Sequence, residues 1–290
     1  MGCTMIFKSH PSPLRPATER RIAPENHAPA RVLLIGLDGT RPDAIVEAHT
    51  PHLDHVMQNG AFTLHASTQC DARTKSGPGW STILTGVNPA KHRVAANQDY
   101  AQSQLRTYPT VLWRAKHTGK LKTAMSVHWD DLANHIIEPD AIDARTVGND
   151  DVVTTAAETY VRDGDFSLIF VHLEDIDSAG HDEGFTPKTP AYRAAIETTD
   201  ARIGRILAAL SQRPTRATEH WTVIITTDHG GTRFGHGARI AACRRIFVFA
   251  MGDSVIPGEL QRPVNQADIT PTILDLLGVH DARVTDGVIL

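Results

Sequence analysis

The sequence predicts an α/β fold, a three-layer α/β/α sandwich with a mainly parallel central sheet. Two observations lead to this prediction: short apolar runs of strand length recur along the chain, and segments with helical spacing separate them. No internal repeat or low-complexity linker divides the 290 residues, of which 41% are hydrophobic. We therefore expect a single folded domain over residues 30–290.

The predicted strands are continuous apolar runs, which suit strands that are buried on both faces, as in a parallel sheet. They cover residues 31–37, 121–127, 166–173, 221–227 and 244–250. The predicted helices cover residues 42–59, 78–86, 108–118, 151–163, 190–212 and 268–277. Among them, the segment 190–212 has the clearest helical spacing of apolar residues.

Residues 1–29 are polar and rich in proline, which predicts a disordered tail. They contain no apolar run typical of a signal peptide, and no run of about 18 apolar residues that could span a bilayer occurs in the sequence. We therefore expect a cytoplasmic protein that does not bind membranes. A net charge of −4 gives no reason to expect a nucleic-acid polymer as partner, and nothing in the sequence predicts an oligomeric state.

The three cysteines, Cys3, Cys70 and Cys243, are far apart in the sequence. Their odd number and wide spacing predict neither a disulfide framework nor a cysteine zinc site. We expect three free thiols.

Side chains that can bind metals follow three of the predicted strands. They are Asp38 after the first run, Glu174, Asp175, Asp177 and His181 after the third, and Asp228, His229 and His236 after the fourth. In such sheets ligands bind beyond the carboxyl ends of the strands, so we expect these side chains to converge. Each aspartate alone could be a turn or capping residue, but convergence of three strand ends favours a site.

Three aspartates and three histidines are enough ligands for two zinc ions, because zinc accepts imidazole nitrogen and carboxylate oxygen and catalytic sites keep a position open. Asp177 and His181 are four residues apart, which places them on one face of a helix or tight turn. Asp228 and His229 are adjacent and could share a metal only in an irregular loop, which the glycines after them permit.

Several stretches resemble motifs of the alkaline phosphatase superfamily, most of all its nucleotide pyrophosphatase/phosphodiesterase branch. They read VLLIGLDGTRPDAI, TPHLDHVMQNG, SGPGWSTILTGVNPAKH, DIDSAGH, TTDHGG, GHG and QADITPTILDLLGV, and they occur in the family's order. The resemblance covers nearly the whole chain after residue 30. It implies an alkaline phosphatase-like metallohydrolase with two divalent metal ions, which we expect to be zinc.

The resemblance implies two ligand sets. One is Asp38, Asp228 and His229, and the other is Asp177, His181 and His236. The gap before His236 is shorter than in much of the family, so His92 and His172 are alternatives for that ligand. Neither lies in a matching GHG or DHG motif, and His92 lies in a segment that does not bind metal in the family. We therefore expect His92 to be structural.

The resemblance also implies the nucleophile, which the family places two residues before a proline at the start of a helix. Here that residue is Ser76, whose hydroxyl a zinc ion would bind and activate. The helix N-terminus would favour a phosphate at the same place. Two alternatives remain: Ser76 only caps the helix, or Thr74 is the nucleophile, since the branch commonly uses threonine. Asn97 corresponds to an asparagine that donates to a phosphate oxygen in that branch.

We thus predict a two-zinc enzyme that cleaves small-molecule phosphoesters, chiefly phosphodiesters or nucleotide pyrophosphates, through a phosphoserine intermediate. The chain reads SGPG where the branch reads TxPN, so a phosphomonoesterase and a phosphonate or sulfate ester hydrolase remain alternatives. A non-catalytic protein that kept the fold is a further alternative. Trp80 stands where sulfatases carry arginine, which counts against the sulfatase mechanism.

Two sets of side chains could adapt the site to its substrate. Extra positive charge for a monoester could come from Arg73, Lys75, Arg93 and Arg233. A nucleobase or aryl group could stack on Trp80, Tyr100, Trp129 or Phe185, although such residues more often serve packing.

Overall fold

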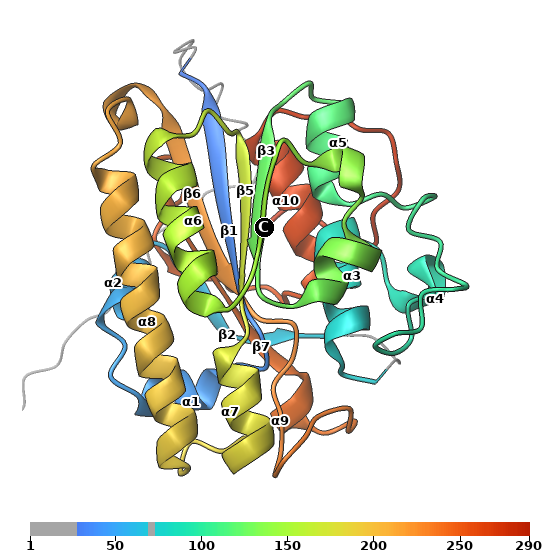
Figure 1. The fold of residues 1–290 in the computed structure, drawn as a ribbon, viewed down its shortest axis with the longest axis vertical. Helices are drawn as coiled ribbons and strands as arrows, with labels where there is room; N and C mark the ends of the chain where they lie inside the picture. The colour runs from blue at the N-terminus through green and yellow to red at the C-terminus, as the bar shows by residue number, and fades with distance from the viewer. Residues whose placement is uncertain (1–27, 69–72) are drawn as a thin grey trace, which may run out of the picture.

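An eight-stranded sheet forms the centre of the protein, with strand order β4-β3-β5-β1-β6-β7-β2-β8 (Figure 1). A computed structural model describes residues 28–68 and 73–290. The strands are β1 (Ala30–Leu37), β2 (Ala61–Ser67), β3 (Thr123–Val127), β4 (Ala144–Val147), β5 (Leu168–Leu173), β6 (His220–Thr226), β7 (Arg245–Gly252) and β8 (Gly258–Glu259). All five predicted strands are present, whereas β2, β4 and β8 were not predicted because they are short or mix polar with apolar residues.

The direction of β7 differs from what its sequence suggests. β7 pairs antiparallel with both β6 and β2, while the other strand pairs are parallel. The sheet is thus mainly parallel, as predicted, and β7 is its antiparallel strand. Its apolar run reflects burial between two helical layers, and burial does not depend on strand direction.

Ten α-helices and four short helical turns lie in the described part of the chain. The α-helices are α1 (Pro42–Glu47), α2 (Pro51–Gln58), α3 (Ser76–Thr85), α4 (Pro89–His92), α5 (Val111–His117), α6 (Asp150–Asp163), α7 (Asp175–Glu183), α8 (Pro190–Ser211), α9 (Ala241–Arg244) and α10 (Ile269–Leu276). The short turns are η1 (Leu132–Ile136), η2 (Pro139–Ala141), η3 (Arg216–Thr218) and η4 (Gln266–Asp268).

The predicted helix 42–59 is two helices, α1 and α2. Pro51 begins α2, and a proline disfavours helical backbone in the residue before it. The helical pattern therefore breaks ahead of Pro51. Helices α4, α7 and α9 were not among the predicted helices, and α7 is the one that matters for the site because it carries Asp177 and His181.

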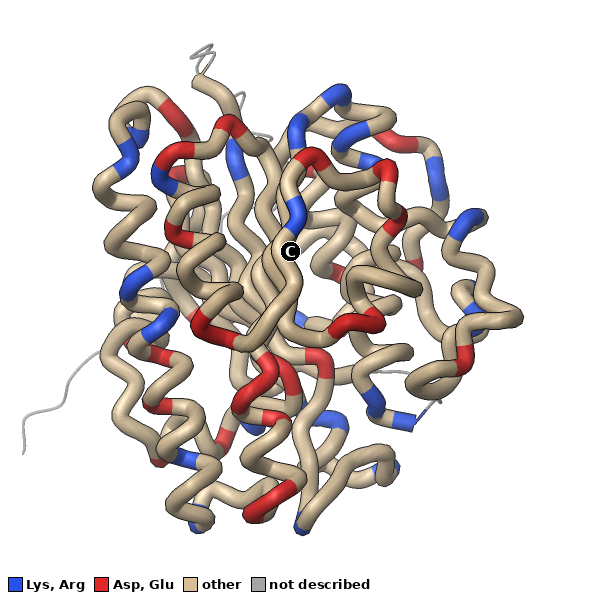
Figure 2. The backbone as a smooth tube through the Cα atoms, in the orientation of Figure 1, with Lys and Arg blue, Asp and Glu red and all other residues tan. Residues whose placement is uncertain are grey.

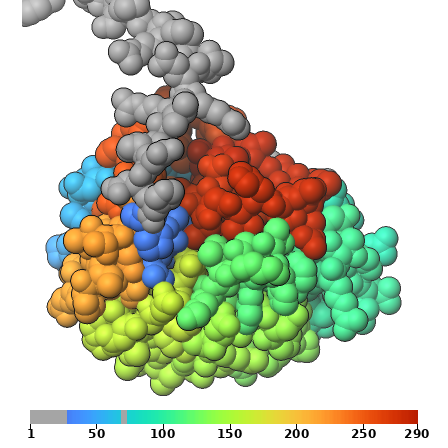
Figure 3. Space-filling model, turned by 90° about the horizontal axis from the view of Figure 1, so that it is seen from above, coloured from blue at the N-terminus to red at the C-terminus, as the bar shows by residue number. Residues whose placement is uncertain are grey.

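Alternate residues of the central strand β1 face two separate hydrophobic cores. Leu33, Ile35 and Leu37 join the core formed with α6 and α8, whereas Val32 and Leu34 join the core formed with α3, α5 and α10. Figure 1 shows these helices on opposite sides of the sheet. From above, Figure 3 shows the blue start of β1 between orange segments on one side and the red C-terminal segments on the other.

The carboxyl ends of β5, β1 and β6 lie next to one another, because these strands are parallel neighbours in the sheet. Acidic residues gather there, below the sheet in the view of Figure 2. The predicted convergence of three strand ends is therefore present in the fold.

Two sequence predictions concern residues outside the described ranges. The predicted tail, residues 1–29, lies outside them except for its last two residues, and Cys3 and Cys70 lie outside them too. Cys243 is a buried free thiol. None of the helices in residues 28–68 and 73–290 has the length and apolar character needed to cross a membrane.

Candidate metal centre

The structure brings the six predicted metal ligands and Ser76 into one continuous group. Ser76 is the first residue of α3, and its Oγ lies 3.4 Å from both Asp38 Oδ1 and His229 Nε2. His229 Nε2 lies 3.2 Å from Asp228 Oδ2. At the other end of the group, His181 Nε2 lies 3.1 Å from His236 Nε2 and 3.3 Å from Asp177 Oδ2.

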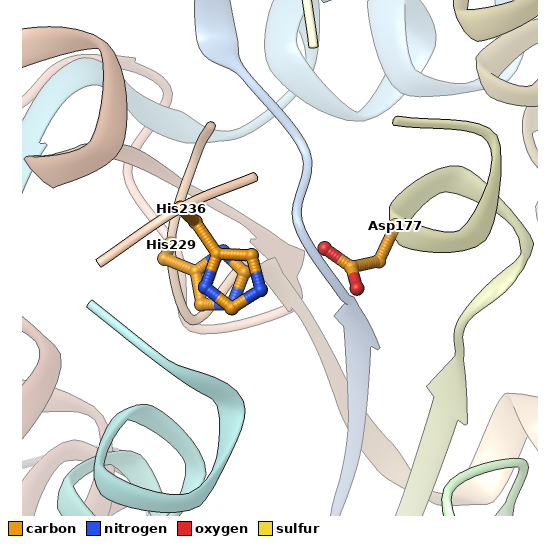
Figure 4. Close-up of side chains that lie close together, drawn as sticks. All are labelled: Asp177, His229 and His236. Carbon is orange, nitrogen blue, oxygen red and sulfur yellow. The ribbon is translucent and has the colours of Figure 1, made fainter. Parts of the chain in front are cut away.

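Two sets of ligand atoms within this group are compact enough to hold a cation. Asp38, Asp228 and His229 form one set, whose ligand atoms all lie within 4.8 Å of one another, as the sequence predicts. Asp177, His229 and His236 form the other, and Figure 4 shows the Asp177 carboxylate facing the two imidazoles. The His229 and His236 rings stack with centroids 3.8 Å apart, so His229 borders both sets.

Each of the three histidines turns one ring nitrogen toward a backbone carbonyl. His229 Nδ1 lies 2.9 Å from the Gly230 oxygen, His181 Nδ1 lies 3.0 Å from the Phe234 oxygen, and His236 Nδ1 lies 2.6 Å from the Thr74 oxygen. A carbonyl can only accept, so each Nδ1 carries the hydrogen. In the neutral rings each Nε2 then keeps its lone pair for the centre, which is the arrangement that orients metal-binding histidines.

The buried carboxylates of the group are suited to binding cations. Asp177 Oδ1 and Asp228 Oδ2 are buried and have no hydrogen-bond partner among the described residues. Burial raises the pKa of Asp228 well above its usual value, and the negative charges of Asp38 and Asp177 raise it further. Unpaired buried carboxylate oxygens are costly, so these residues fit divalent metal ions.

The Asp38 carboxylate has two further partners, Trp80 and His172, which the sequence suggests for stacking and for metal binding. Its Oδ2 accepts hydrogen bonds from Trp80 Nε1 at 2.8 Å and from His172 Nε2 at 3.0 Å. Burial acts to raise the pKa of Asp38, but the His172 hydrogen bond and the nearby His229 outweigh it and hold this pKa below its usual value. The signal for Trp80 was its position four residues after Ser76, on the same helical face.

The structure gives two other candidates, Thr74 and His92, different surroundings. The Thr74 Oγ1 accepts a hydrogen bond from the Gly237 N–H at 2.8 Å, so this hydroxyl holds the loop that carries His236. His92 is fully buried, with ring nitrogens 3.1 Å from Thr82 Oγ1 and 3.1 Å from the Val94 nitrogen. Burial lowers the pKa of His92 to about 4.

Ser76 is buried and is the first residue of α3, not its cap. Lys75 is the N-cap residue of α3 and makes no side-chain capping bond. The next backbone N–H, that of Gly77, donates to Asn97 Oδ1 at 2.8 Å. Because this contact fixes Oδ1 as the acceptor, the Asn97 amide nitrogen stays available to donate to a ligand.

The candidates for stacking on a substrate lie in different places. Trp80 and Phe185 are fully buried, so they serve packing and offer no free aromatic face to a substrate. Tyr100 stacks on His135 with ring centroids 4.8 Å apart, and its hydroxyl donates to Asp131 at 3.0 Å. Trp129 is partly buried.

The four predicted cations differ in how exposed they are. Arg73, Arg93 and Arg233 are exposed and Lys75 is partly buried. Arg73 and Lys75 both lie beside Gly237, next to His236.

Comparison with known proteins identifies the family. The family model described as "Metalloenzyme superfamily" matches residues 32–281, which is most of the chain. The protein is a member of the metalloenzyme superfamily. Its fold is the alkaline phosphatase-like fold, and the superfamily contains metal-dependent hydrolases and mutases.

Relatives of this metalloenzyme include a human protein named ectonucleotide pyrophosphatase/phosphodiesterase family member 5. It is 24% identical over 226 residues, covering 70% of this chain and 45% of the relative. A 2,3-bisphosphoglycerate-independent phosphoglycerate mutase from a Picosynechococcus strain is 29% identical over 147 residues, covering 47% of this chain and 26% of the mutase. The metalloenzyme thus matches less than half the length of either relative.

Two solved structures share its fold. An inactive form of the murine ectonucleotide pyrophosphatase/phosphodiesterase 5, in complex with AMP, superposes with a TM-score of 0.73 at 17% identity, covering 89% of this chain and 97% of that one. A 2-O GAG sulfatase superposes with a TM-score of 0.74 at 14% identity, covering 91% and 73%.

A second acidic group, beside the centre, has its own positive charge. His128, Asp150 and Asp175 lie close together, but the Arg202 guanidinium donates to Asp150 at 3.4 Å and to Asp175 at 2.8 Å. The buried Asp150 also accepts the backbone N–H groups of residues 174 and 175, at 2.9 and 3.2 Å. This carboxylate therefore fixes the start of α7, the helix that carries Asp177 and His181.

Removing this carboxylate should destabilise the protein. Asp150→Ala leaves Arg202, His128 and two backbone N–H groups without a buried partner, so we expect a loss of about 3–5 kcal/mol in the free energy of unfolding. Urea denaturation measures it. The matched control is Asp151→Ala, because Asp151 also pairs with Arg202 but its side chain is 75% exposed. The control should cost less than about 1 kcal/mol, and equal losses would contradict this role for Asp150.

Replacing Asp228 should have opposite effects on the metal-free and the metal-loaded protein. The folded-state pKa of Asp228 is raised, so its contribution to stability is present below its unfolded pKa and is lost as pH rises through the folded pKa. Asp228→Asn removes the buried charge and should raise the Tm of the chelator-treated protein near pH 8, by about 2–4 °C for each kcal/mol gained.

With metal present, the same substitution should lower the Tm relative to the wild type, because it removes a candidate ligand. Differential scanning calorimetry of both proteins, with and without chelator, measures the reversal. A lower Tm for the variant in both conditions would show that the site does not accumulate uncompensated negative charge.

Proposed function

We propose that this metalloenzyme hydrolyses small-molecule phosphoesters, chiefly phosphodiesters or nucleotide pyrophosphates, with two zinc ions and with Ser76 as the nucleophile. The position of the Ser76 hydroxyl carries the proposal. It lies between Asp38 Oδ1 and His229 Nε2, 3.4 Å from each, at the first residue of a helix. A serine hydroxyl needs activation to attack, and a metal held by these two ligands would supply it.

The donor set supports zinc, because imidazole nitrogen and carboxylate oxygen are the ligands that zinc takes in catalytic sites. One ion would be held by Asp38, Asp228, His229 and Ser76, and the other by Asp177, His181 and His236. When bound, such a metal pair neutralises the charge on the phosphoryl oxygens and activates the attacking and leaving oxygens.

The protein itself would orient the reacting groups. The Ser76 Oγ would attack phosphorus and form an O–P bond while the bond to the leaving alcohol or phosphate breaks, and the serine proton would end on the leaving group. Water would then cleave the Ser76 O–P bond of this phosphorylated serine and release the product. Asn97 would donate its amide N–H to a non-bridging phosphate oxygen, since its Oδ1 is held by the Gly77 N–H. The N-terminal end of α3 would add a favourable field for the anion.

The relatives support a phosphoester substrate. The human relative is named a pyrophosphatase/phosphodiesterase, and the murine structure is in complex with AMP. A phosphomonoesterase is the second candidate, because Lys75 and Arg73 lie beside Gly237 at the centre and could balance the extra charge of a monoester. Phosphonate and sulfate esters remain weaker alternatives, since buried Trp80 replaces the arginine expected of sulfatases. The complete ligand set counts against a non-catalytic protein.

The two candidates predict opposite substrate preferences. Zinc-loaded protein should cleave bis-p-nitrophenyl phosphate faster than p-nitrophenyl phosphate, and a chelator should abolish both reactions. Release of p-nitrophenol measures the rates. A clear preference for the monoester would move the assignment to a phosphomonoesterase.

Removing the Ser76 hydroxyl should stop turnover without removing the metal. We expect Ser76→Ala to lower kcat by a factor of about 10³ or more, with zinc content close to that of the wild type. The matched control is Thr74→Val, which removes a hydroxyl that holds the His236 loop and should cost less activity. An inactive Thr74→Val together with an active Ser76→Ala would identify Thr74 as the nucleophile.

A further inference from the structure

The Asp38 carboxylate divides its two oxygens between different partners. Oδ2 accepts the Trp80 Nε1–H at 2.8 Å and the His172 Nε2–H at 3.0 Å. Oδ1 faces the Ser76 hydroxyl at 3.4 Å and His229 Nε2 at 3.7 Å. Since two donors occupy the lone pairs of Oδ2, only Oδ1 is left for a ligand.

The fold builds this contact from three elements. Trp80 lies four residues after Ser76 on α3, so both side chains point from one helical face toward the end of β1. His172 lies on β5 in register with Gly36 of β1, two residues before Asp38. The Trp80 and His172 rings meet edge to face with centroids 5.0 Å apart.

Gly36 makes room for the pair. A Cβ at position 36 would overlap the Trp80 ring, so the indole can lie over the strand only because glycine stands there. Trp80 and His172 are both fully buried. Neither side chain can therefore reach a substrate, and any effect that they have on the reaction must pass through Asp38.

We propose that Trp80 and His172 are positioning residues that hold Asp38 so that it presents Oδ1 alone to the metal shared with Ser76. The inference rests on the proposed function, in which Asp38 and Ser76 bind the same ion. Partners that orient a ligand in this way typically change metal affinity or activity by about 10–100-fold when they are removed.

The alternative is that the two N–H groups only satisfy a buried carboxylate. The protein contains such a contact elsewhere: the fully buried Trp221 donates its Nε1–H to Glu219 at 2.7 Å, at the amino end of β6. That pair lies at the amino ends of the central strands, whereas the metal centre lies at their carboxyl ends. It therefore provides a matched control for the loss of an indole N–H from a buried carboxylate.

The test compares zinc affinities, by chelator competition, of the wild type and four full-length variants. His172→Phe and Trp80→Phe remove an N–H donor and keep an aromatic ring, His172→Gln keeps an N–H donor, and Trp221→Phe is the control. We expect the two donor-removing variants to lower the affinity for one of the two zinc ions by about 10–100-fold and the affinity for the other ion much less. His172→Gln should recover most of this loss.

Kinetics on bis-p-nitrophenyl phosphate gives a second readout. In zinc excess, the donor-removing variants should show a lower kcat with a nearly unchanged KM, because Asp38 acts on the nucleophile rather than on substrate binding. Trp221→Phe should lose thermal stability but keep both zinc affinities and kcat. Circular dichroism and the Tm of each metal-free variant show whether it has folded.

Folded His172→Phe and Trp80→Phe proteins with wild-type affinity for both zinc ions would overturn the inference. So would equal losses in His172→Phe and His172→Gln, or a loss of zinc affinity in Trp221→Phe as large as that in Trp80→Phe. A wild type that binds two zinc ions but cleaves no phosphoester would contradict the proposed function alone, since the affinities would still decide the role of the pair. A wild type that binds no zinc would overturn both.

Discussion

The repulsion among three buried carboxylates is the constraint on which the rest of this site depends. Asp38, Asp177 and Asp228 meet where β1, β5 and β6 end, and two of their oxygens have no partner among the described residues. Burying ionised groups without compensation is unfavourable, so the folded protein needs cations at this point. His181, His229 and His236 surround these carboxylates and suit the same cations. Each turns Nδ1 to a backbone carbonyl, so its Nε2 faces the carboxylates.

The supports of the centre come from parts of the chain that lie far apart in sequence. The Asp150 carboxylate fixes the start of α7 and, with it, Asp177 and His181. Thr74 binds His236 and Gly237 through its carbonyl and hydroxyl, just ahead of Ser76. A segment next to Ser76, the proposed nucleophile, thus holds the loop that carries the candidate ligand His236. Such supports keep a constellation of ligands in place before a metal or substrate arrives.

The comparisons place this chain on a scaffold that pyrophosphatases, mutases and sulfatases share, so the fold alone does not select the reaction. The selection depends on side chains around the common metal positions. Here these are a serine at the start of α3, an asparagine bound to the next backbone N–H, and a buried tryptophan on the candidate metal ligand Asp38. Together they support the proposed transfer of a phosphoryl group to Ser76 over sulfatase chemistry.

The sequence alone predicts the layered α/β fold, the five long strands and the group of candidate ligands that meets beyond three of them, because buried strands and ligand motifs are local patterns. It could not show the direction of β7, since burial gives an antiparallel strand the same apolar run as a parallel one. Nor could it show that His172 and Trp80 contact Asp38 and that Thr74 holds His236. Those contacts join residues that are distant along the chain. Only the tertiary packing, of α3 and β5 around the end of β1 and of the His236 loop against the segment before α3, brings them within hydrogen-bond distance.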